Sequence, residues 1–130
     1  MVKTKLPVQT KVDDGNGKIV TTAREIDVAV DTSIFAEQRW EANFPAQAKN
    51  ETLFAYIERV QENKLIDKAH ILSNLKAIFC FIESDEIADF KSFCQLFDLA
   101  DGEYLKRLTD KIEYIFNIVL NSSAVTPKNS

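Results

Sequence analysis

The feature that most constrains the fold is a change in the spacing of apolar residues at Thr32. Before Thr32, apolar residues alternate with polar ones, which gives a β-strand one apolar face. After Thr32, they recur every three or four residues, as on the buried side of an amphipathic α-helix. The sequence therefore predicts an α+β protein, mainly α, in which a β unit over residues 1–30 precedes a helical body over residues 31–120.

Three short runs predict the strands of the β unit. The first surrounds Leu6–Val12, and the Asp14–Gly17 segment that follows it is typical of a tight hairpin turn. The second is the β-branched run Lys18–Thr22, and the third is the alternating run Ile26–Val30. Because so small a sheet is not stable alone in water, we expect its apolar face to pack on the helices.

The helical body is predicted to be a bundle of about five helices. Their expected ranges are Thr32–Pro45, Asn50–Lys64, Asp67–Glu83, Ser84–Phe97 and Asp101–Val119. Capping residues at several starts, and Pro45 at the end of the first helix, set these ranges. The polar residues Asn121–Ser130 are expected to form a mobile tail. With 130 residues in total, we expect a single domain with one core.

Charge and hydropathy disfavour several classes of function. The net charge is -4, from 20 acidic and 16 basic residues spread along the chain, so no basic stripe indicates nucleic-acid binding. The longest apolar run, Ala77–Ile82, is far too short to cross a membrane, and the N-terminus lacks the apolar run of a signal peptide. Cys80 and Cys94 lie in apolar helical patterns, which indicates buried, unlinked thiols and a cytoplasmic location.

No catalytic, cofactor-binding or metal-binding constellation is visible, so no enzyme activity is predicted. His70 is the only histidine, and metal sites need three or four converging ligands. The Asp13–Gly17 segment lacks the bidentate glutamate that a calcium loop requires. An enzyme would need His70, Cys94 and remote carboxylates to converge in space.

The first predicted helix carries the candidate partner-binding residues. These are Glu37, Arg39, Trp40, Glu41 and Phe44. Aromatic and arginine side chains dominate the binding energy of many protein interfaces. The alternative is that Trp40 anchors the core against the second predicted helix.

Three segments give the chain a resemblance to a known family. They are Val30-Asp31-Thr32-Ser33, then Glu37-Gln38-Arg39-Trp40-Glu41-Ala42-Asn43-Phe44-Pro45, and Glu51-Thr52-Leu53-Phe54-Ala55-Tyr56-Ile57-Glu58-Arg59. With them, the chain resembles the tail assembly chaperones of long-tailed phages that infect Gram-positive bacteria. The small β unit, the acidic balance and the length also fit this family.

The resemblance implies a role in the cytoplasm of the infected cell and absence from the mature virion. Such chaperones coat the tape measure protein, keep it soluble, and help to recruit the major tail protein, in many cases through a frameshifted longer form. We expect a groove that binds an amphipathic client helix, many copies along each client, and self-association into a homo-oligomer. No cofactor is implied. The alternative from another class is a small regulatory adaptor that binds and inhibits one host partner.

Overall fold

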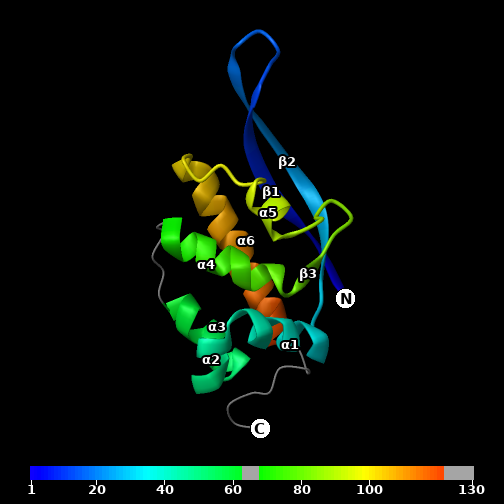
Figure 1. Ribbon diagram of the computed structural model, residues 1–130, viewed down its shortest axis with the longest axis vertical. Coiled ribbons are helices and arrows are strands. Elements are labelled where there is room, and N and C mark those ends of the chain that lie inside the picture. The colour runs from blue at the N-terminus through cyan, green and yellow to red at the C-terminus, as the bar shows by residue number, and fades with distance from the viewer. Residues whose placement is uncertain (63–67, 122–130) are drawn as a thin grey trace.

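The computed structural model describes residues 1–62 and 68–121 (Figure 1). In chain order its elements are β1 (Val2–Asp13), β2 (Ile19–Val30), α1 (Ile34–Asn43), α2 (Pro45–Asn50), α3 (Leu53–Glu62), α4 (Lys68–Phe79), β3 (Ile82–Glu83), α5 (Phe90–Cys94) and α6 (Gly102–Leu120). The predicted α+β class with a helical majority is confirmed. The predicted boundary near Asn63 and Lys64, the predicted helix start at Asp67 and the tail after Asn121 lie outside the described residues.

The N-terminal hairpin is longer than the sequence predicted. β1 and β2 pair in antiparallel register along their whole length, from Val2 opposite Val30 to Asp13 opposite Ile19. The predicted second and third strands are therefore one strand. The less regular stretch between them does not interrupt it, because the backbone ladder continues whatever the polarity of the side chains.

The predicted turn of the hairpin is confirmed. The carboxylate of Asp13 accepts hydrogen bonds from the backbone N–H groups of Gly15 and Gly17, at 2.9 and 3.2 Å. Both glycines have positive φ angles, 91° and 80°, a conformation that side-chain-bearing residues rarely adopt. The turn chemistry therefore fixes the register of the long hairpin.

The third strand comes from a different part of the chain than predicted. β3 pairs with the Ala29–Val30 end of β2, which gives the strand order β1-β2-β3. The sequence predicted a helix through Glu83, whereas α4 ends at Phe79. The carbonyl of Phe81 instead accepts the N–H of Asp31, at 2.6 Å. The apolar run Ala77–Ile82 thus spans the end of α4 and the start of β3. The periodicity of a short apolar run cannot distinguish a buried helix from a buried strand.

Helix α6 covers the apolar face of the hairpin and crosses the body beside it (Figure 1). Its predicted cap is confirmed: the Asp101 carboxylate accepts the backbone N–H groups of Glu103 and Tyr104 and a hydrogen bond from the Gln9 amide. The Tyr104 hydroxyl donates to the carbonyl oxygen of Pro7, at 2.8 Å. The core between them is formed by buried side chains from both elements, among them Leu6, Ile26, Val28, Leu108, Ile112 and Ile115.

The smaller helices depart from the prediction at their starts. Pro45 does not only end α1; it is also the first residue of α2, a position that suits its fixed φ angle. The next helix begins after Thr52, whose hydroxyl accepts the N–H of Ala55, and not after Asn50. Likewise α5 begins after Asp89, and the predicted start at Ser84 is wrong.

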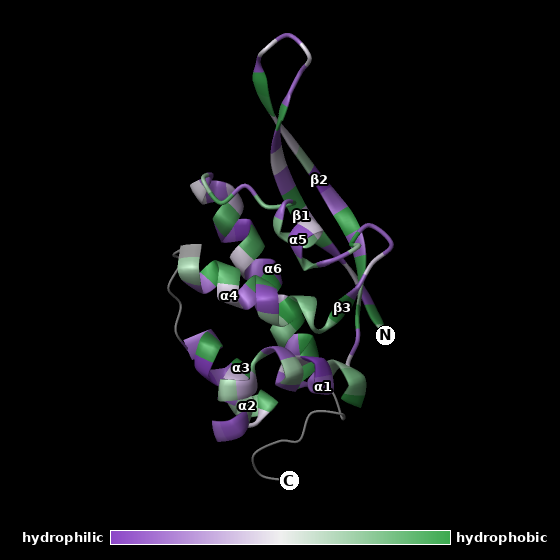
Figure 2. Cartoon of the chain, in the orientation of Figure 1, coloured by the Kyte–Doolittle hydropathy of each residue, from purple (hydrophilic) through white to green (hydrophobic). Residues whose placement is uncertain are grey.

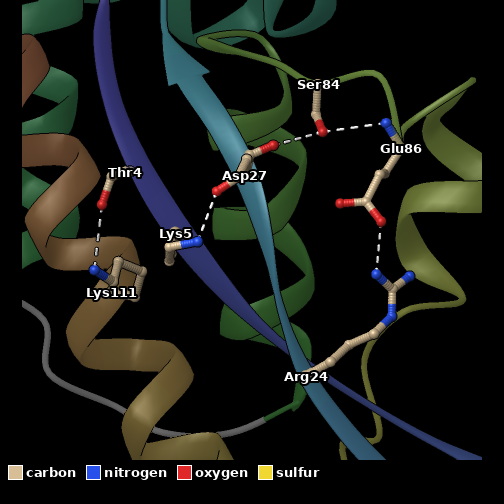
Figure 3. A network of polar contacts seen from close by, with 7 residues as sticks. All are labelled: Thr4, Lys5, Arg24, Asp27, Ser84, Glu86 and Lys111. Atoms are coloured by element: carbon tan, nitrogen blue, oxygen red, sulfur yellow. Dashed lines mark hydrogen bonds and ion pairs between the residues drawn. The ribbon is translucent and has the colours of Figure 1, made fainter.

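The loop after β3 is tied to the outer edge of β2 near its base (Figure 3). The Ser84 hydroxyl donates to the carbonyl oxygen of Asp27 at 2.7 Å, and Arg24 pairs with Glu86 at 2.6 Å. Lys5 pairs with Asp27 across the hairpin at 2.9 Å, and Lys111 of α6 donates to the Thr4 hydroxyl at 3.3 Å. The contacts of Ser84, Glu86 and Lys111 hold the base of the hairpin to the rest of the protein, and the Lys5 pair joins its two strands.

The far end of the hairpin projects beyond the helices (Figure 1). Every residue from Lys11 to Glu25 is exposed, although the strands remain paired. We call residues 10–22 the distal arm, which begins at the paired residues Thr10 and Thr22.

Candidate partner-binding site

The candidate site is a hollow of about 350 Å³ among α1, α2 and α3. Its lining consists of Glu37, Trp40, Glu41, Ala48, Glu51, Thr52, Leu53 and Phe54. Trp40 and Leu53 are buried and form the floor, while Glu41 and Thr52 are exposed at the rim. Three of the five residues predicted from the sequence, Glu37, Trp40 and Glu41, therefore come together here.

The rim of the hollow is acidic. Glu37 and Glu41 are four residues apart on α1, so their side chains are neighbours on the helix. Burial, and then the negative charge of Glu41, raise the pKa of Glu37. Among the described ion pairs none involves either residue, whereas Glu51 is held by Arg59 at 2.6 and 3.2 Å. The site thus offers two carboxylates that lack a cation from the described part of the chain.

Trp40 anchors an aromatic cluster under the hollow. It is 1% exposed, and its ring centroid lies 5.2 Å from that of Tyr56 and 6.5 Å from that of Phe44. This arrangement matches the interpretation of Trp40 as a core anchor against the second predicted helix. Phe44 is also buried and does not line the hollow; the Lys76 ammonium lies over its ring, 4.9 Å from the centroid.

Arg39 points away from the hollow and binds within the protein. Its Nη2 donates to Oδ2 of Asp31 at 2.9 Å, and its Nε donates to the carbonyl oxygen of Cys80 at 2.9 Å. Burial by itself raises the pKa of the Asp31 carboxyl, but hydrogen bonds from Ser33 and the Arg39 guanidinium outweigh it, so the pKa lies below its usual value. Arg39 therefore joins the end of β2 to the junction between α4 and β3.

Ala48, Glu51 and Phe54 also line the hollow, although the sequence does not predict them as site residues. They reach the hollow because α2 turns the chain back between α1 and α3. The available signal was Pro45, which favours the first position of a helix as much as it ends one. Predicting a short helix after Pro45 would have placed Glu51 and Phe54 near α1, as the structure does.

The residues considered for catalysis lie in different places. His70 borders a separate hollow of about 150 Å³, together with Tyr56, Arg59 and Ser73, and Cys94 on α5 is not part of that lining. Over residues 1–62 and 68–121, no group of three His, Cys, Asp or Glu side chains is placed to hold a metal ion. In the same ranges, no helix has both the length and the apolar character needed to cross a membrane.

The two cysteines differ in burial, which gives a testable difference in reactivity. Cys80 is 2% exposed, as predicted, and burial raises the pKa of its thiol to about 11. Cys94 is only half-buried, so its predicted full burial is wrong, and burial raises its thiol pKa as well. Because the thiolate is the reactive form, a thiol reagent at pH 8 should label Cys94 slowly and Cys80 more slowly still.

Mass spectrometry of the labelled peptides measures both rates, and denaturant should bring them to the same fast value. Equal native rates at the two positions would contradict the described difference in burial. The substitution Cys94→Ser provides the control, because it leaves Cys80 as the only thiol.

Comparison of the chain with protein-family models, curated proteins and solved structures returned no match.

Proposed function

We propose that the protein is a phage tail assembly chaperone that binds and solubilises the tape measure protein. The observation that carries the proposal is that two of the three segments that resemble this family, Glu37–Pro45 and Glu51–Arg59, supply most of the lining of the hollow. Trp40 packs against the tilted ring of Tyr56 beneath the hollow, and Glu51 lines the hollow together with Glu41. Side chains from both segments thus line the same hollow.

The chemistry of the hollow suits an amphipathic helix with basic flanks. Its buried floor accepts an apolar side chain, and the carboxylates of Glu37 and Glu41 attract a lysine or arginine one turn away on the client. One such contact is weak. Many copies along an elongated client cover its apolar stripe and bind avidly together.

The proposal places the protein in the cytoplasm of the infected cell and outside the mature virion. The major tail protein displaces it as the tube assembles, and a frameshifted longer form would contact that protein. Helix α6 ends at Leu120, on the side of the body away from the distal arm (Figure 1).

Co-expression with a phage tape measure protein tests the proposal. We expect the client to stay soluble, to co-purify, and to carry several copies of the chain by native mass measurement. The double substitution Glu37→Gln, Glu41→Gln should weaken binding of a client helix by about 3- to 10-fold, because each lost rim charge is worth about 0.3–0.7 kcal/mol. Isothermal titration with a peptide from the client measures this change.

A matched control removes two exposed carboxylates outside the hollow. Glu62→Gln with Asp110→Asn changes the net charge equally and should leave the affinity unchanged. An insoluble client and no complex with any tail component would contradict the chaperone proposal. A tight one-to-one complex with a single host protein would instead favour the adaptor alternative.

A further inference from the structure

The exposed apolar side chains of the described residues gather at two ends of the molecule. Val12, Ile19 and Val20 lie on the distal arm, and Met1, Val2, Ile34, Phe35 and Tyr114 lie at or near the opposite end of the hairpin. Figure 2 shows hydrophobic (green) segments towards both ends of the hairpin. Leu72 on α4 is the remaining large apolar side chain that is exposed in these residues.

The distal arm continues the face of the hairpin that α6 covers. Leu6 and Ile26 are paired on that face at the base, and Thr10 with Thr22 and Val12 with Val20 follow on the same face towards the turn. None of these four arm residues is charged. A two-stranded ribbon is marginally stable alone in water, so the uncovered face favours contact with another surface.

The opposite end carries a shallow hollow of about 400 Å³. Its lining consists of Val2, Thr32, Tyr114, Asn117, Ile118 and Asn121. All six are uncharged, although charged residues make up 28% of the chain. Ile34 and Phe35, which are 60% and 66% exposed, follow Thr32 closely at the start of α1.

We propose that the distal arm of one copy binds in this hollow of a second copy. The uncharged arm face and the uncharged lining match each other, and the contact covers Val12 and Val20 on the arm and Val2 and Tyr114 in the hollow. An arm-to-arm contact would leave Val2 and Tyr114 exposed.

Val2 and Val12 lie ten residues apart on a continuous strand, which separates the two surfaces by about 33 Å. Each copy therefore keeps a free arm or a free hollow after one contact. Repeating the contact gives an open head-to-tail chain when the rotation between copies does not close a ring. The inference deepens the proposed coating of a client, but it concerns contact between copies and needs no client.

Sedimentation velocity of the purified chain over a concentration series tests the inference. We expect the wild-type mass to rise with concentration. The arm variant Val12→Lys, Val20→Glu places an ion pair across the strands, which preserves their pairing while charging the face. The hollow variant Tyr114→Glu charges the other surface, and both variants should be monomeric at the highest concentration. Leu72→Glu is the matched control and should assemble like the wild type.

Mixing the two monomeric variants distinguishes a head-to-tail contact from an arm-to-arm contact. The arm variant keeps its hollow and the hollow variant keeps its arm, so the mixture should form a one-to-one dimer and nothing larger. A monomeric wild-type protein would overturn the inference. Assembly of Tyr114→Glu at the wild-type level would overturn it too, because it would indicate an arm-to-arm contact.

Circular dichroism establishes that each variant is folded. If a charged variant loses its helical signal, Val12→Thr with Val20→Thr and Tyr114→Ser replace it. These milder changes should each raise the dissociation constant at least fivefold, and unchanged assembly in both would overturn the inference.

Discussion

Replacing Trp40 with alanine is expected to lower the free energy of unfolding by about 3–5 kcal/mol, the usual cost of truncating a buried large aromatic side chain. The indole ring is 1% exposed and packs against Phe44 at the end of the same helix and against Tyr56 of α3. Truncation would leave a cavity where α1 and α3 meet. Denaturant unfolding followed by circular dichroism measures the loss.

Phe35→Ala on the same helix is the matched control. Phe35 is 66% exposed, so the monomer should change by no more than about 0.5 kcal/mol. The indole N–H has no hydrogen-bond partner among the described residues, so Trp40→Phe should cost less than Trp40→Ala. A loss below about 1 kcal/mol for Trp40→Ala would show that the ring does not support the core.

The second large effect is expected at Arg39. Arg39→Ala leaves the buried carboxylate of Asp31 without its cation and should lower the free energy of unfolding by about 2–3 kcal/mol. This loss is smaller than that for a fully buried ion pair because the guanidinium is partly exposed. Arg24→Ala is the control, because its pair with Glu86 is exposed on both sides and should be worth less than about 1 kcal/mol.

The Arg39 effect should depend on pH. The folded-state pKa of Asp31 is lowered, so its ionised form stabilises the protein above the unfolded-state pKa of about 3.9, and this contribution disappears as the pH falls through the folded-state pKa. The difference between wild type and Arg39→Ala should therefore be full at pH 7 and shrink below about pH 4. Denaturant unfolding at several pH values measures it. A difference that does not change with pH would exclude the ion pair as its cause.

The sequence predicted those elements that local chemistry determines. The hairpin turn follows from two glycines and two aspartates, and the start of α6 follows from the Asp101 cap. It failed where tertiary contacts decide. β3 lies in a continuous apolar run that also suits a helix, and only pairing with Ala29 and Val30 makes it a strand.

The candidate site was only partly predictable for a similar reason. Glu37, Trp40 and Glu41 share one helix, so helical spacing placed them near one another. Arginine is a residue type that often contributes to protein interfaces, which is why the sequence indicated Arg39. Its actual partners, Asp31 and Cys80, are 8 and 41 positions away in the chain. No local pattern shows that such a side chain is already occupied within its own fold.

The packing of α6 against the hairpin has a consequence for biosynthesis. The strands leave the ribosome first, but the helix that covers Leu6 and Ile26 begins only at Gly102. During translation the apolar face of the hairpin therefore stays exposed while most of the chain is being synthesised. Nascent chains arrested before Gly102 should be sensitive to protease and prone to aggregate, and protection should appear abruptly once α6 has emerged.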